Sequence, residues 1–329
     1  MSARLPVDVI TGFLGAGKTT LLRRLLARPE LAGAAVLVNE FGEIGLDHLL
    51  LERIDGDVVL LKSGCVCCTV RGDLKAALEA LLGRRARGEI AFDRVAIETT
   101  GLADPTPVFA TIAADAALKH RLRMGAVVCV VDALNGAATL DAHDVSLRQA
   151  AAADRIVVSK TDLAPPEACS ALAARLRALN PVAELLLLDA ETPPPALWLT
   201  GAGEGPPSRW RADTPAAEPG HDARAFLLEA EAPLDWARFG LWLSMLLNAH
   251  GDDILRLKGV VAIEGVAGPV AIQGVQRVVH APEHLEAWPD GDARTRLVVI
   301  ARTIDPERVR RSFRAFVGRA GTNAAAASA

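Results

Sequence analysis

The sequence predicts an α/β domain with a mostly parallel sheet, followed by a smaller α+β domain. Short apolar runs alternate with helical patterns as far as residue 190, which is typical of a parallel sheet covered by helices. A glycine-rich loop joins the first apolar run to the first helical pattern. The composition then changes over residues 191–222, and a length of 329 residues suits two domains better than one core.

The apolar runs of the first domain, residues 1–190, have the length of buried strands. We expect strands at residues 5–10, 35–38, 58–61, 95–97, 126–131, 156–158 and 184–188. Helical patterns lie between them, for example at residues 19–27, 71–82 and 167–179. In a sheet of this kind, ligands bind at the carboxyl ends of the strands.

Residues 191–222 are rich in proline, glycine and alanine, which indicates a linker. Regular patterns resume in a second domain, residues 223–318, where an antiparallel sheet with helices is expected. Its strands are expected at residues 224–229, 259–264, 269–275 and 296–300, and its helices at residues 235–247 and 306–316. The alanine-rich residues 319–329 are expected to form a flexible tail.

The charge and composition exclude several classes of protein. A formal net charge of −4 leaves no basic excess for general nucleic-acid binding. The chain begins without a signal-peptide pattern, and no apolar run reaches the ~18 residues of a membrane span. We therefore expect a cytoplasmic protein without a membrane or nucleic-acid partner, in which disulfides are not expected.

The glycine-rich loop has a specific chemistry. Residues 12–19 read GFLGAGKT and match the P-loop pattern G-x-x-x-x-G-K-[ST] at every position. Backbone N–H groups of such a loop close around a phosphate, and the following helix N-terminus adds partial positive charge. Lys18 is expected to reach the β- and γ-phosphates, and Thr19 to ligate Mg²⁺. The expected nucleotide contacts of this P-loop NTPase domain are Gly12, Gly15, Ala16, Gly17, Lys18, Thr19 and Thr20.

A second phosphate-site element follows the strand expected at residues 95–97. Residues 98–101 read ETTG and place an acid at the strand end, with glycine three residues later. Glu98 is expected to hold Mg²⁺, and the Gly101 N–H to meet the γ-phosphate. Lys18, Thr19 and Glu98 are the expected catalytic residues.

The identity of the nucleotide's base is indicated by residues 159–162, which read SKTD after the strand expected at residues 156–158. They resemble the N-K-x-D motif of GTPases, with Ser159 in the place of asparagine. The Asp162 carboxylate would accept from the N1–H and 2-amino groups of guanine, and the Lys160 stem would lie along the base. GTP and GDP are therefore the expected nucleotides.

Three of the five cysteines lie within four positions, at Cys65, Cys67 and Cys68. In an extended segment Cys65 and Cys67 project to the same side. Thiolates select ions such as Zn²⁺ or Cu(I) and also take Co²⁺, so we expect a transition-metal site with an open shell. A redox sensor and a labile disulfide remain alternatives. Cys129 and Cys169 are expected to be buried.

These motifs together resemble the CobW-like GTPases, relatives of the nickel-insertion GTPases UreG and HypB. The resemblance is carried by residues 11–22 (TGFLGAGKTTLL), 39–43 (NEFGE), 64–68 (GCVCC), 98–105 (ETTGLADP), 255–259 (LRLKG) and 273–276 (QGVQ). It covers nearly the whole chain, and the combination of P-loop, C-x-C-C and E-x-x-G is highly specific.

The resemblance implies slow, Mg²⁺-dependent GTP hydrolysis and the handling of a metal, usually Zn²⁺ or Co²⁺. Glu40 and Glu43 would lie in the first switch segment as additional metal ligands. Two departures from the family are Ser159 and the absence of a histidine-rich linker, where only His221 occurs. Metal storage by the linker is therefore not expected.

The resulting expectation is a GTP-dependent metallochaperone that delivers its ion to a client protein. The alternatives are a redox-responsive regulatory GTPase that uses the thiols as a sensor, and a small-molecule kinase. The sequence shows no acceptor pocket or catalytic base for a kinase. A homodimer is left open.

Overall fold

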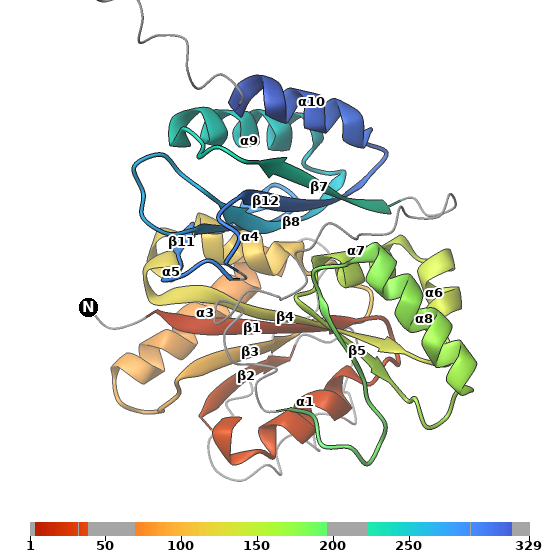
Figure 1. Cartoon of the computed structure of the whole chain (residues 1–329). Helices are drawn as coiled ribbons and strands as arrows, with labels where there is room; N and C mark the ends of the chain where they lie inside the picture. The colour runs from red at the N-terminus through yellow and green to blue at the C-terminus, as the bar shows by residue number, and fades with distance from the viewer. Residues whose placement is uncertain (1–3, 32, 39–69, 196–222, 290, 318–329) are drawn as a thin grey trace, which may run out of the picture. The chain divides into compact units, whose positions relative to one another are not determined.

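The structure, a computed structural model, describes residues 4–31, 33–38, 70–195, 223–289 and 291–317. The chain divides into two compact units. One comprises residues 1–177 and 183–205, and the other comprises residues 178–182 and 206–329. Figure 1 labels their helices and strands.

The N-terminal unit is built on a six-stranded sheet in the order β2-β3-β1-β4-β5-β6. Every neighbouring pair in this sheet is parallel. The strands are β1 (Leu5–Gly12), β2 (Ala34–Val38), β3 (Arg94–Glu98), β4 (Leu122–Asp132), β5 (Arg155–Ser159) and β6 (Glu184–Leu187). The order places β1 beside β3 and β4, so that the loops after these three strands lie at one edge of the sheet.

Helices cover both faces of this sheet (Figure 1). Leu21, Leu22 and Leu25 of α1 pack with Ile10 and Val128 in the buried core on one face. On the opposite side of the sheet from α1 lie α4 and α5, which contact β4. The helices are α1 (Lys18–Leu26), the short 3₁₀ helix η1 (Pro29–Leu31), α3 (Val70–Ala86), α4 (Thr106–Ala114), α5 (Ala116–Arg121), α6 (Gly136–Ala142), α7 (Asp144–Ala152) and α8 (Pro166–Leu179).

The C-terminal unit carries a second sheet in the order β10-β9-β8-β12-β7, with β11 paired to β9. All of its strand pairs are antiparallel. Its elements are β7 (Ala223–Ala230), α9 (Trp236–His250), β8 (Ile254–Val261), β9 (Val270–Val275), β10 (Val278–Val279), β11 (Glu283–His284), β12 (Thr295–Arg302) and α10 (Pro306–Val317).

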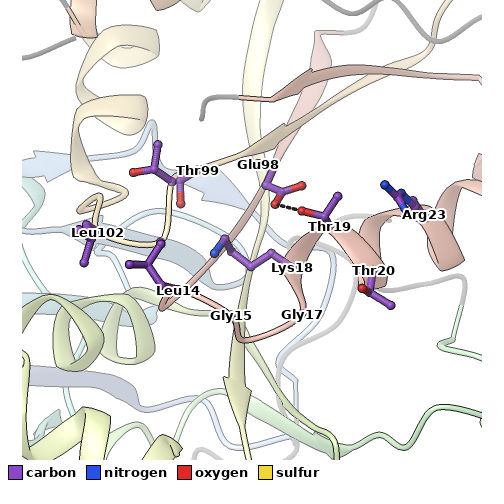
Figure 2. A pocket seen from close by; sticks show the side chains of 12 residues that line it. Leu14, Gly15, Gly17, Lys18, Thr19, Thr20, Arg23, Glu98, Thr99 and Leu102 are labelled. Atoms are coloured by element: carbon purple, nitrogen blue, oxygen red, sulfur yellow. Dashed lines mark hydrogen bonds between the residues drawn. The ribbon is translucent and has the colours of Figure 1, made fainter. Parts of the chain in front are cut away.

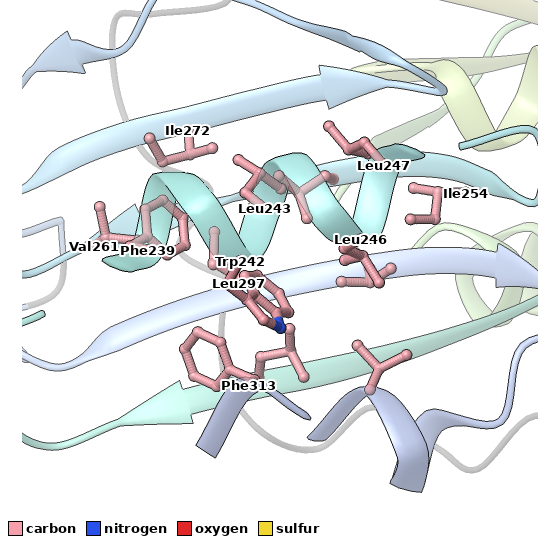
Figure 3. Close-up of a cluster of buried hydrophobic side chains, with 14 of the residues drawn as sticks. Phe239, Trp242, Leu243, Leu246, Leu247, Ile254, Val261, Ile272, Leu297 and Phe313 are labelled. Atoms are coloured by element: carbon pink, nitrogen blue, oxygen red, sulfur yellow. The ribbon is translucent and has the colours of Figure 1, made fainter. Parts of the chain in front are cut away.

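Side chains of α9 form the centre of the C-terminal core (Figure 3). The Trp242 ring meets Phe313 of α10 edge to face, with 4.9 Å between ring centroids. Its indole N–H donates to the Ser312 hydroxyl over 3.1 Å, so the polar end of this buried ring is satisfied. The two helices are thereby fixed to each other above the sheet.

The predicted fold class is confirmed, a parallel α/β domain followed by a domain with an antiparallel sheet. One expected strand was placed wrongly, because β8 spans Ile254–Val261 and not residues 259–264. Arg256 and Lys258 interrupt the apolar pattern of this strand, yet both are buried within it. The expected strand at residues 58–61 and nearly all of the expected linker and tail lie outside the described residues.

Candidate functional site

The loop between β1 and α1 adopts backbone conformations that favour glycine over other residues. Gly12 has a φ of 139°, and a Cβ built on it would lie 2.2 Å from the carbonyl oxygen of Val130 on the neighbouring strand. Gly17 has a φ of 93° and precedes the first residue of α1, Lys18. The loop therefore ends at a helix N-terminus, whose free N–H groups favour an anion.

This loop and the residues after β3 line one cavity of about 410 Å³ (Figure 2). Its lining residues are Leu14, Gly15, Gly17, Lys18, Thr19, Thr20, Arg23, Glu98, Thr99, Thr100, Gly101 and Leu102. Lys18 is only 8% exposed, and its Nζ donates to the carbonyl oxygen of Phe13 over 3.1 Å. The cavity therefore combines a lysine ammonium with a helix N-terminus, an arrangement suited to a phosphate group.

An oxygen-rich pair lies in the same cavity. The Thr19 hydroxyl donates to Oε1 of Glu98 over 2.7 Å, and Glu98 is 2% exposed. Figure 2 shows the two side chains pointing toward each other from α1 and β3. A hydroxyl and a carboxylate are hard oxygen donors of the type that Mg²⁺ prefers, so the donor set fits this ion.

The turn after β3 lies directly against the glycine-rich loop. A Cβ built on Gly101 would lie 2.6 Å from the backbone nitrogen of Leu14, so a larger residue would displace one of the two segments. The turn is closed by the Ala103 N–H, which donates to the Thr100 carbonyl over 3.1 Å. Its start is tied to β1, since the buried Thr99 hydroxyl donates to the Thr11 hydroxyl over 2.9 Å.

Two residues at the end of β5, Ser159 and Lys160, bind the glycine-rich loop. The Ser159 hydroxyl donates to the carbonyl of Ala16 over 2.7 Å, and Lys160 Nζ donates to the carbonyl of Gly15 over 2.8 Å. Lys160 has a φ of 58° and also pairs with the Asp132 carboxylate at 2.7 Å. Burial alone would raise the pKa of Asp132, but the hydrogen bond from Lys160 and backbone N–H donors hold it below its ordinary value.

Comparison with known proteins agrees with this geometry. The family model described as "CobW/HypB/UreG, nucleotide-binding domain" matches residues 6–186, and that described as "Cobalamin synthesis protein cobW C-terminal domain" matches residues 223–317. The chain belongs to the CobW/HypB/UreG family.

Relatives of this family are similar over most of the chain. The zinc chaperone YjiA of Escherichia coli (strain K12) is 32% identical over 314 residues, which are 94% of this chain and 98% of YjiA. The zinc-regulated GTPase metalloprotein activator 1 of Schizosaccharomyces pombe is 38% identical over 189 residues, 55% of this chain and 45% of that protein. The crystal structure of Zn(II)-bound YjiA GTPase from E. coli aligns with a TM-score of 0.70 and 28% identity, covering 96% of this chain and 99% of the other.

Two residues of this CobW-type site were not predicted from the sequence. Asp132, at the end of β4, orients Lys160, and an acid at the carboxyl end of a strand is a signal that would have found it. Gln149, in the middle of α7, donates to the carbonyls of Gly101 and Ala103, and no local pattern marks it. The expected base contact Asp162 is exposed.

The expected transition-metal ligands of the family lie outside the described residues. These ligands are Cys65, Cys67, Cys68, Glu40 and Glu43. Over the ranges that are described, no group of three or more His, Cys, Asp or Glu side chains is placed to hold a metal ion. Cys129 and Cys169 are buried free thiols. Among the helices of the described ranges, none is both long and apolar enough to cross a membrane.

Proposed function

We propose that this chain is a cytoplasmic GTP-hydrolysing metallochaperone that binds a transition metal and delivers it to a client protein under control of the GTP/GDP state. The observation that carries the proposal is the single cavity in which Lys18, Thr19, Glu98 and Gly101 meet. Zinc is the first candidate ion, because the relatives are named a zinc chaperone and a zinc-regulated GTPase metalloprotein activator. Cobalt is the second.

In this function the loop N–H groups and the side chains of Lys18, Thr19 and Glu98 have defined tasks, as does the Gly101 N–H. The loop N–H groups bind the β-phosphate, and the Lys18 ammonium offsets the charge that develops on the β- and γ-phosphates. Thr19 and Glu98 would hold Mg²⁺, which neutralises charge on the phosphate oxygens when bound. The Gly101 N–H would meet the γ-phosphate, and the close approach of its turn to Leu14 of the loop supports this assignment.

Selection of guanine rests on the segment after β5. The exposed Asp162 carboxylate accepts from two guanine donors that adenine does not offer in this pattern. Ser159 binds the phosphate loop through the Ala16 carbonyl. Lys160, held by Asp132 and Gly15, places its aliphatic stem beside the base.

The metal is the cargo of the proposed cycle. Cys65, Cys67 and Cys68 would bind it as thiolates, with Glu40 and Glu43 adding ligands in the GTP state. Since the three thiolates come from one short segment, they leave the ion open to transfer. A client that receives the ion is consistent with the name metalloprotein activator given to the relative from S. pombe.

The proposal is tested with reduced, metal-free protein. Phosphate release is measured from GTP and from ATP in the presence of Mg²⁺, and Zn²⁺ affinity is measured by chelator competition in the GTP-analogue and GDP forms. We expect release from GTP, and tighter zinc binding in the GTP-analogue form than in the GDP form. A Cys65→Ser/Cys67→Ser variant is the control, which should hydrolyse GTP without binding zinc. Equal zinc affinities in both states would contradict nucleotide-controlled delivery.

A further inference from the structure

Gln149 is a buried polar side chain that is hydrogen-bonded to Gly101, a residue that lines the cavity. It lies on α7 and is 0% exposed. Its Nε2 donates to two backbone carbonyls, that of Gly101 over 3.2 Å and that of Ala103 over 2.9 Å. These bonds join α7 to the turn after β3, across 48 and 46 residues of sequence.

The turn is thereby held from two sides. On one side Gly101 approaches the glycine-rich loop so closely that a Cβ would lie 2.6 Å from the backbone nitrogen of Leu14. On the other side Gln149 binds the carbonyls of Gly101 and Ala103. The Gly101 turn therefore has little room to move toward or away from the cavity that it lines.

The orientation of the Gln149 amide follows from its acceptors. Both partners are carbonyl oxygens, so the NH₂ group has to face them and Oε1 faces away. Within the described part of the chain Oε1 is buried and has no hydrogen-bond partner. Burial of an unsatisfied acceptor destabilises the folded protein, and an apolar side chain of similar length would avoid this cost. What the amide adds at this position is its pair of donors to the Gly101 turn.

We propose that Gln149 is a positioning residue that holds the Gly101 turn where the Gly101 N–H can donate to the γ-phosphate. This inference rests on the proposed function, because it assigns a task toward the γ-phosphate of bound GTP. A nucleotide without a γ-phosphate makes no use of that N–H. Gln149 therefore sets the preference for the triphosphate over the diphosphate.

The test is the ratio of the dissociation constants for GDP and for a non-hydrolysable GTP analogue. Gln149→Met keeps the length of the side chain and removes both donors. Its affinity for the GTP analogue should fall about tenfold, in line with the loss of buried hydrogen bonds, while its affinity for GDP stays near that of the wild type. Leu147→Ala on the same helix is the control, because it removes buried packing and leaves the hydrogen bonds of Gln149 to the turn in place. It should lower the melting temperature and leave the ratio unchanged.

Gln149→Leu serves as a second variant should Gln149→Met fail to fold, because it places no charge at the buried position. It also lacks both donors, so the ratio should fall as far as in Gln149→Met. An unchanged or increased preference for the GTP analogue in a folded Gln149 variant overturns the inference and leaves the proposed function standing. Absence of binding of either nucleotide to the wild type instead overturns the proposed function.

Discussion

The Thr19 hydroxyl donates a 2.7 Å hydrogen bond to Glu98, although the two residues are 79 positions apart in the chain. Parallel pairing of β1 with β3 brings them together, since the loops after both strands lie at the same edge of the sheet. A carboxylate with a hydroxyl at this distance is the oxygen pair to which we assign Mg²⁺.

Glu98→Gln should therefore weaken Mg²⁺ binding while keeping the shape of the site. The amide oxygen can still accept from Thr19, but the negative charge is lost. We expect the Mg²⁺ concentration for half-maximal GTP hydrolysis to rise and the saturated rate to fall about a hundredfold. Thr19→Ser, which keeps the hydroxyl, is the matched control and should stay within a few-fold of the wild type. A normal Mg²⁺ titration for Glu98→Gln would refute this assignment.

Lys18→Ala should abolish measurable GTP hydrolysis. Lys18, which is 8% exposed, lines the cavity, and alanine would remove the positive charge expected to face the β- and γ-phosphates. The wild type itself should turn over slowly, on the order of 10⁻⁴ to 10⁻² s⁻¹, as unassisted GTPases do. Single-turnover phosphate release measures both, and circular dichroism confirms the fold of the variant. A wild-type rate above about 1 s⁻¹ without a partner would contradict a slow switch.

Asp162 should determine the preference for guanine. GTP should bind the wild type at least about tenfold more tightly than ATP, a difference of ~1.4 kcal/mol. Asp162→Asn replaces an acceptor by a donor opposite the 2-position of the base. The affinity for GTP should therefore fall, and the affinity for xanthosine triphosphate should rise relative to that for GTP. Because Asp162 is exposed, the melting temperature should stay unchanged. Equal affinities of the wild type for GTP and ATP would disprove the guanine assignment.

Asp8 should make stability depend on pH in the neutral range. Burial raises its pKa from 3.8 to about 7, against a backbone hydrogen bond from Ala126 and the charges of Arg94, Arg123 and Arg155. An acid whose pKa is raised in the folded state stabilises the fold fully below its unfolded pKa. That stability is lost as the pH rises from about 4 through about 7.

The comparison with Asp8→Asn isolates this effect, because the amide does not titrate. The free energy of unfolding of the wild type, relative to the variant, should fall by about 1.4 kcal/mol for each unit by which the pH rises between about 4 and 7, and should level off above pH 7. Urea unfolding at pH 5, 6, 7 and 8 gives both curves. Parallel curves would show that the folded-state pKa of Asp8 is close to its ordinary value.

Fast reaction with a thiol reagent should come only from the three cysteines of residues 65–68. Burial raises the pKa of Cys129 to about 12, and Cys169 is only 5% exposed, so both should react slowly with a thiol reagent at pH 8. Fast reaction in the native, metal-free protein then belongs to Cys65, Cys67 and Cys68. Zn²⁺ should suppress this fast phase, and mass spectrometry identifies the protected residues. Fast labelling that zinc leaves unchanged would argue against the metal site.

Features that depend on local pattern were predictable from the sequence. Apolar runs gave the strands of the parallel sheet, and the spacing of Gly12, Gly17 and Lys18 gave the phosphate loop, because a short stretch of chain determines both. The contact of Gln149 with Gly101 was not predictable, since it depends on how α7 packs against a turn 48 residues away. Strand β8 was misplaced because the pattern treats Arg256 and Lys258 as exposed, while the fold buries them. The roles of Ser159 and Asp162 as base contacts remain predictions.

The two hydrogen bonds from Ser159 and Lys160 to the carbonyls of Ala16 and Gly15 have a consequence for the kinetics of substrate selection. They tie the segment expected to contact the base to the loop expected to contact the phosphates, so a base that fits badly should also displace the phosphate loop. We therefore expect an incorrect nucleotide to be rejected twice, once when it binds and again when it reacts. Discrimination against ATP should then enter kcat as well as KM, and the selectivity in turnover should exceed the selectivity in affinity.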